Sequence, residues 1–183
     1  YWRGDSKREQ LQRIYATAYF GKDELKEYLH RIAEAEKRDH RKLGIQLDLF
    51  RILPEAPGFP LWMPNGTIVF NELVTEIRRK IRRRGYLEAR TPHIMNADLW
   101  KRSGHWDHYR QNMYVTQIEE KDFAVKPMNC PGSALVFSQG LRSYRELPFR
   151  LAEMGLCHRF EESGALSGMT RVRSFVQDDG HIY

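Results

Sequence analysis

The sequence predicts an α+β fold in which helices flank an antiparallel sheet. Apolar residues recur at helical spacing in two early segments and alternate in the last third of the chain. The helical and extended segments follow one another without the regular βαβ rhythm that a parallel sheet would produce. The chain has 183 residues, enough for one well-buried domain or for one domain with a helical appendage.

The first part of the chain reads as such an appendage. Leu25, Leu29 and Ile32 share one helical stripe and predict a helix over about 22–43, with Gly44 as its stop. A stretch rich in Pro and Gly follows at 53–60 and reads as a loop. We therefore expect a helical linker in residues 1–52 and the main domain in residues 53–183.

The main domain is expected to open with a short extended piece at 61–64 and a turn at Asn65-Gly66. Phe70, Val74 and Ile81 then mark the apolar stripe of a second helix, which ends at Gly85. A strand over 86–92 follows and stops at a proline.

The remaining elements are predicted in chain order. Residues 96–112 form a polar, aromatic region, and short strands follow at 113–116 and 123–126. A helix is expected over 132–141, and antiparallel strands from Leu147 onward enclose a loop at 163–168.

Composition narrows the class of protein. The net charge of +6 fits a polyanionic partner such as RNA, or substrates that carry phosphate, without requiring either. The basic run at 78–84 is either the solvated face of a helix or an RNA contact. No apolar run approaches the roughly 20 residues that span a bilayer, and the first residues do not resemble a signal peptide, so we expect no membrane partner and a cytoplasmic location. Two cysteines cannot build a disulfide scaffold.

The densest chemistry lies near the C-terminal end. Arg159 and Glu161 are two residues apart, as are Arg171 and Arg173, so on strands each pair would point to one face. A guanidinium can hold a phosphate through a forked pair of hydrogen bonds. The same residues could equally form a surface hairpin with exposed ion pairs, each of which contributes little.

A metal site is a second possibility from the residues alone. Cys130 and His181 could together bind zinc, because a thiolate and an imidazole suit that ion. Two ligands so far apart in sequence are not a metal signature, and each residue is more often simply buried or hydrogen-bonded. Asp178 and Asp179 could bind an ammonium or a metal, or could form a turn that caps a strand.

Four stretches resemble the threonyl-tRNA synthetase family. The run Phe-Ala-Val-Lys-Pro-Met-Asn-Cys-Pro-Gly at 123–132 is similar to the segment that carries the family's zinc-binding cysteine. Residues 150–183, with Cys-His-Arg-Phe-Glu and Gln-Asp-Asp-Gly-His, resemble the second signature of class II synthetases. The helix and strand before Pro92 resemble the first signature, which builds a dimer interface, and residues 1–5 with the next helix resemble the join to the editing region. The resemblance covers nearly the whole chain and implies the front part of a class II catalytic core.

The resemblance implies an ATP-dependent ligase. Threonine would attack the α-phosphate of ATP, which is bound with Mg2+, and the resulting adenylate would pass threonine to tRNA(Thr). We therefore expect threonine, ATP and tRNA(Thr) as partners, together with a second copy of the chain in a homodimer.

Roles carry over position by position. Arg159 matches the catalytic arginine on the α-phosphate. The other matches are Glu161, Arg171 and Phe175 for ATP, Met128, Gln177 and Asp179 for the amino-acid pocket, and Cys130 and His181 for two of three protein ligands to Zn2+. An open position on that ion would bind the amino and hydroxyl groups of threonine together, which valine cannot reproduce.

The resemblance also has departures. In the family the third zinc ligand, the third class II signature and the anticodon-binding domain lie further along, so we expect residues 1–183 alone to be inactive. Ser133 and Ser167 stand where the family often has histidine, which affects expected contacts to tRNA and ATP. Two alternatives remain: a sibling class II synthetase for proline or serine, and a non-catalytic paralogue that binds RNA.

Overall fold

The computed structural model describes all of residues 1–183, and the chain divides into two compact units. The first unit contains Tyr1–Thr67 and Glu162–Arg171, and the second contains Ile68–Glu161 and Val172–Tyr183. Because these units interleave along the sequence, they do not test the predicted division at residue 53, which stays a prediction. None of the helices combines the length and apolarity that crossing a membrane requires.

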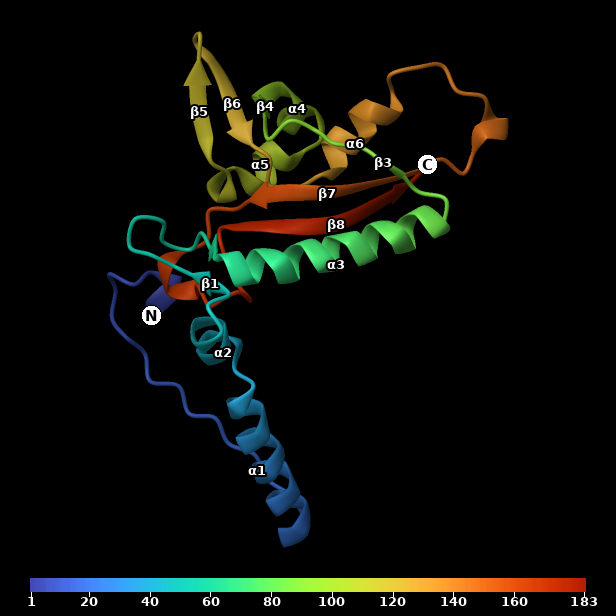
Figure 1. Ribbon diagram of the computed structural model, residues 1–183. Helices are drawn as coiled ribbons and strands as arrows, with labels where there is room; N and C mark the ends of the chain where they lie inside the picture. The colour runs from blue at the N-terminus through green and yellow to red at the C-terminus, as the bar shows by residue number, and fades with distance from the viewer. The chain divides into compact units, whose positions relative to one another are not determined.

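Helices and short strands alternate irregularly along the chain, as the sequence predicted (Figure 1). The helices are α1 (Lys22–Lys37), α2 (His40–Gln46), α3 (Pro64–Arg83), α4 (Ala97–Arg102), α5 (His105–Tyr109) and α6 (Cys130–Phe137), with single 3-10 turns at η1 (Trp2–Gly4), η2 (Arg110–Asn112), η3 (Tyr144–Glu146) and η4 (Ser163–Ala165). The strands are β1 (Phe50–Arg51), β2 (Leu61–Trp62), β3 (Leu87–Glu88), β4 (Ile94–Asn96), β5 (Val115–Ile118), β6 (Lys121–Val125), β7 (Arg150–His158) and β8 (Ser174–Ile182).

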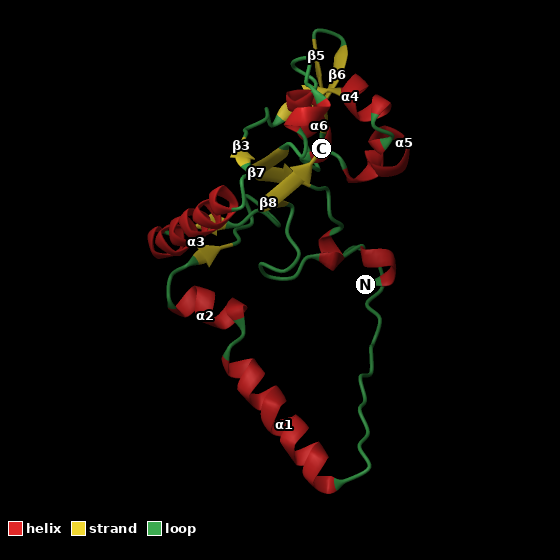
Figure 2. Cartoon of the chain, turned by 90° about the vertical axis from the view of Figure 1, so that its right-hand side faces the viewer, coloured by secondary structure: helices red, strands yellow, loops and turns green.

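The first unit is mostly helix and loop, with one small antiparallel pair, β1 and β2. Figure 2 shows a long loop between η1 and α1. The single helix predicted over 22–43 is wrong, because Asp39 caps a new helix by accepting a hydrogen bond from the Arg41 N–H at 2.8 Å. Gly44 lies inside α2 and does not end it.

The turn predicted at Asn65-Gly66 is also wrong, since both residues lie in the first turn of α3. Pro64 begins this helix, and a proline in the first turn lacks only an N–H that would have no helical partner. Gly66 is buried, and a Cβ on it would lie 1.8 Å from the Leu49 carbonyl oxygen. Close backbone approach, and not a turn, therefore explains this glycine.

The second unit contains two three-stranded sheets. In one, β7 lies between β3 and β8, and in the other, β6 lies between β4 and β5. All pairings are antiparallel except β3 with β7, which is parallel. The nine-residue strands β7 and β8 form the longest ladder and appear as adjacent arrows in Figure 1.

The strand predicted over 86–92 is reduced to Leu87 and Glu88. Its pairing stops because the Thr91 N–H donates to the side-chain carboxylate of Glu153 at 2.9 Å and not to a backbone carbonyl of the neighbouring strand. The region 96–112 folds into α4, α5 and η2, starting from Asn96, whose side chain caps α4 by accepting from the Asp98 N–H. These helices surround a core of Trp100, Met113 and Ala124.

Candidate functional site

One face of β8 carries four of the predicted site residues. Phe175, Gln177, Asp179 and His181 alternate along the strand, and all four are half-buried while the residues between them are exposed. Because successive side chains of a strand point to opposite faces, these four share one face. The ladder with β7 places Gly155 beside Gln177 and Glu153 beside Asp179.

Cys130 is the first residue of α6, which follows β6 in the chain, and its side chain lies near this face of β8. The ligand atoms of Cys130, Asp179 and His181 all lie within 4.8 Å of one another. Two ligands of a tetrahedral zinc ion, bound at the usual Zn–S and Zn–N lengths, lie roughly 3.6 Å apart. The thiol and the imidazole therefore fit a zinc ion after a small side-chain adjustment. Burial and the nearby Asp179 carboxylate raise the pKa of the Cys130 thiol, and a bound cation would oppose both effects.

The remaining predicted pocket residues flank this group. Met128 lies two residues before Cys130, and its sulfur is 3.1 Å from Nε2 of His105. The amide oxygen of Gln177 contacts the Cys157 sulfur, with a sulfur-to-oxygen distance of 3.7 Å. Both side chains are therefore held by neighbours within the second unit.

The structure brings Arg159 and Phe175 together. The Arg159 guanidinium carbon lies 5.1 Å from the centre of the Phe175 ring, a cation–π distance. Its Nε donates to the Pro127 carbonyl at 3.2 Å, which ties the arginine to the loop before α6. A cationic group that lies over an aromatic ring provides neighbouring groups for a phosphate and for a flat base.

Glu161 lies beyond the strand on which it was predicted. β7 ends at His158, and the Phe160 N–H turns away from the ladder to the Asn112 carbonyl at 2.9 Å. Arg173, which precedes β8, donates from Nε and Nη2 to the Glu161 carbonyl at 3.0 and 2.8 Å. The sequence indicated Arg173 only through its spacing from Arg171. In the structure, the Arg173 side chain holds the backbone at Glu161.

Arg171 is not on a strand either, because β8 begins at Ser174. It belongs to the first unit, where it forms an isolated antiparallel bridge with Ser167. Ser167 therefore contributes backbone hydrogen bonds to this loop. Ser133, the other departure from the family pattern, lies buried in α6 with its Oγ 2.8 Å from the Tyr183 hydroxyl.

Two buried polar residues near the site were missed by the sequence reasoning. Lys126 is fully buried and donates to Thr91 Oγ1 at 2.9 Å and to the Glu153 carboxylate at 2.7 Å. Asn129, also fully buried, donates to the Asp179 carboxylate at 3.3 Å. Only their position near Cys130 in the sequence could have indicated them, since their partners, Thr91, Glu153 and Asp179, lie far away in the sequence.

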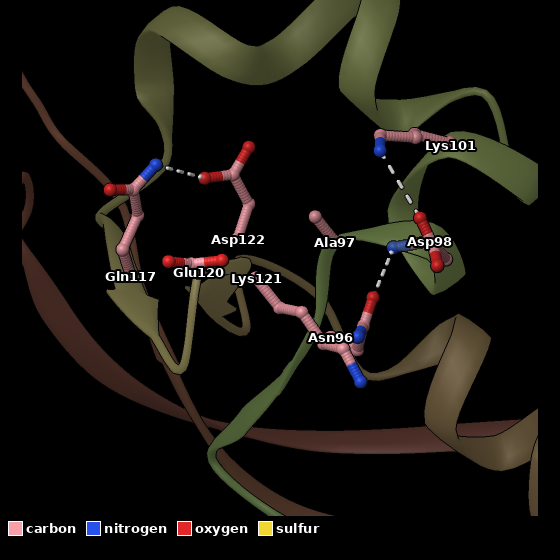
Figure 3. A pocket seen from close by; sticks show the side chains of 8 residues that line it. All are labelled: Asn96, Ala97, Asp98, Lys101, Gln117, Glu120, Lys121 and Asp122. Atoms are coloured by element: carbon pink, nitrogen blue, oxygen red, sulfur yellow. Dashed lines mark hydrogen bonds and ion pairs between the residues drawn. The ribbon is translucent and has the colours of Figure 1, made fainter.

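A polar hollow elsewhere in the second unit contains none of the predicted residues. It is lined by α4 and the β5–β6 hairpin, and Figure 3 shows interactions between some of the lining side chains. Lys101 pairs with Asp98 at 3.1 Å, and Gln117 donates to Asp122 at 3.1 Å. These pairs join four of the residues that line the hollow, and none of the predicted site residues lies among them.

Comparison with known proteins adds to this geometry. Residues 114–183 match the family model described as the tRNA synthetase class II core domain (G, H, P, S and T). The whole chain is 58% identical to the threonine–tRNA ligase of Burkholderia multivorans and 59% identical to that of Burkholderia mallei, and it spans 29% of the length of each.

Solved structures give a consistent result. A structure described as the RNA binding domain of threonyl-tRNA synthetase from Cryptosporidium parvum is 49% identical, with a TM-score of 0.77 over 79% of this chain and 36% of its own. A prolyl-tRNA synthetase from Giardia lamblia is 18% identical, with a TM-score of 0.66 over 74% of this chain and 28% of its own, and shows the fold alone.

Proposed function

We propose a function from the premise that this chain belongs to the threonyl-tRNA synthetase family, as part of its catalytic core. The family and the class II fold predicted from the sequence are both confirmed by the comparisons. In the intact protein, these residues form part of the site that activates threonine with ATP and transfers it to tRNA(Thr).

The ATP side of the site is proposed around Arg159. The arginine keeps its charge at any working pH and would hold the α-phosphate, where negative charge develops during adenylate formation. Phe175, against which Arg159 lies, would stack on adenine. Glu161 would add a further nucleotide contact, with Mg2+ accompanying the phosphates. Arg171, which belongs to the first unit, stays a prediction of an ATP-binding residue from the family match.

The amino-acid side is proposed around Asp179. Its carboxylate would bind the threonine ammonium, while Met128 and Gln177 line the pocket. Cys130 and His181 would hold Zn2+ together with a ligand from another part of the protein. When bound, the ion would supply an open coordination position for the amino and hydroxyl groups of threonine together, so valine, which has no hydroxyl, would bind less well.

A homodimer is proposed from the surface of α3 within the second unit. Ile68, Val69 and Leu73 are exposed on this helix, with exposed fractions of 63%, 46% and 60%. Apolar side chains grouped on one exposed helix are typical of a protein contact. Cytoplasmic location is proposed as the ordinary setting for charging tRNA.

The observation that carries the proposal is the convergence of Cys130, Asp179 and His181 within 4.8 Å. The test is threonine-dependent exchange between pyrophosphate and ATP, measured on the full-length protein. Arg159→Lys keeps the charge but loses the forked geometry, and we expect a fall in kcat of roughly 100-fold. Arg145→Lys, a substitution of the same kind at an exposed position, is the control and should change little.

The alternative of a non-catalytic paralogue makes a different prediction. Such a protein would bind tRNA but would show no exchange with threonine in the wild type. Equal exchange by wild type and the Arg159→Lys variant would instead remove Arg159 from the proposed mechanism.

A further inference from the structure

Asn129 occupies a helix-capping position but does not use its side chain as a cap. It is the N-cap residue of α6, where an asparagine side chain commonly accepts a hydrogen bond from the first turn, and no such bond is present. Its amide instead points into the protein, where the residue is fully buried, and donates to Oδ2 of Asp179 at 3.3 Å. The Asn129 side chain therefore contacts the predicted ammonium-binding carboxylate and does not cap the helix.

The surroundings of Asn129 fix the orientation of its amide. A carboxylate can only accept, so the NH2 group must face Asp179. On its other side, Oδ1 accepts from the Cys157 thiol at 3.4 Å. Burial raises the pKa of Cys157 to about 11, so this thiol keeps the proton that it donates. The same sulfur lies 3.7 Å from the Gln177 amide oxygen, so one buried pair contacts both Gln177 and Asp179.

Gly155 leaves the space that Asn129 fills. A Cβ on Gly155 would lie 2.0 Å from Oδ1 of Asn129, which is far inside van der Waals contact. Gly155 is directly opposite Gln177 in the ladder. The glycine on β7 and the asparagine before α6 therefore fit together behind the row of site residues on β8.

We propose that Asn129 is a positioning residue for the amino-acid pocket, an inference that rests on the proposed function. By holding Oδ2 of Asp179, it keeps Oδ1, which lies 4.0 Å from Nδ1 of His181, directed toward the site where the threonine ammonium binds. Without this bond, the carboxylate is free to rotate, and Oδ1 loses its fixed direction. A hydrogen bond to a charged group contributes more than one between two neutral groups, so its loss has a measurable effect.

Asn129→Asp is the variant that separates positioning from packing. It preserves the shape that fits against Gly155 but replaces the donor with an acceptor. In the full-length protein, we expect the KM for threonine in pyrophosphate exchange to rise roughly 10- to 100-fold. The KM for ATP and the zinc content should stay at wild-type values. The ratio of threonine to valine use should also stay unchanged, because both amino acids carry the ammonium.

Asn65→Asp is the matched control, since Asn65 is exposed and donates to the Leu47 carbonyl away from the predicted residues. If Asn129→Asp fails to fold or loses zinc, Cys157→Ala is the variant that tests the role of Asn129. It removes the thiol that donates to the Asn129 amide oxygen and orients that amide. We then expect a rise in the threonine KM of about 3- to 10-fold, with the KM for ATP unchanged.

The outcomes separate this inference from the proposed function. Wild-type protein without threonine-dependent exchange would overturn the proposed function. If the wild type is active and a folded Asn129→Asp variant has a threonine KM within about threefold of the wild-type value, the role of Asn129 alone would be overturned. A parallel rise in the KM for ATP would also overturn it, because that result indicates general disruption of the fold.

Discussion

Replacing Lys126 with methionine should destabilise the protein more than most single substitutions. The Lys126 side chain has no exposed surface, and that of Glu153 is 9% exposed. Lysine bonds the Glu153 carboxylate at 2.7 Å, and Thr91 adds a backbone N–H at 2.9 Å and a hydroxyl at 3.1 Å. Removal of the lysine leaves Glu153 with its charge in a dry setting and only the two Thr91 donors.

The size of the effect follows from that uncompensated charge. Removing one partner of a buried ion pair costs about 3–5 kcal/mol, whereas neutralising both partners costs much less. In the double variant Lys126→Met/Glu153→Gln, the glutamine can still accept from the Thr91 N–H, so no backbone donor is orphaned. We expect the double variant to lose only about 1 kcal/mol, close to one ordinary hydrogen bond.

Urea unfolding followed by circular dichroism would measure these differences as changes in the free energy of unfolding. Lys121→Met on β6 is the control, because Lys121 is exposed and its loss should stay within about 0.5 kcal/mol. A Lys126→Met variant that loses less than about 1 kcal/mol would refute the reasoning. A double variant that is as unstable as the single one would also refute it, since the buried charge would then not be the cause.

Two further predictions concern stability. Burial, the largest cause, raises the pKa of Cys157 from its ordinary 9.0 to about 11. Unfolded chains therefore lose this proton first, so the contribution of Cys157 to stability should fall as pH rises from about 9 to about 11. Cys157→Ala should remove this fall in urea titrations at each pH. Gly66→Ala would place a Cβ 1.8 Å from the Leu49 carbonyl oxygen and should cost about 1–3 kcal/mol. An unchanged melting temperature would contradict that expectation.

The fold was predictable where local patterns decide it. The stripe of Phe70, Val74 and Ile81 gave α3, and the alternation after Leu147 gave β7 and β8. Element ends were less predictable when a distant side chain set them, as when Glu153 takes the Thr91 N–H and shortens β3. Asp39 is a local signal for the start of a helix, but the spacing of apolar residues, on which the single helix was predicted, does not include it.

The candidate site depended on the resemblance more than on spacing. Cys130 and His181 are far apart in sequence, and only the fold brings them within 4.8 Å. Period two along β8 places Gln177 and Asp179 on the same face as His181. Asn129 could not be found in this way, because its importance comes from contacts with β7 and β8 that no local pattern encodes.

Zinc content measured by elemental analysis on the full-length protein tests the central claim most directly. We expect about one zinc ion per chain, as the tetrahedral site requires. Cys130→Ala should lose both the zinc and the threonine-dependent pyrophosphate exchange, while Cys157→Ala should keep the zinc. A folded wild-type protein without zinc, or a Cys130→Ala variant that retains it, would contradict the proposed threonine site.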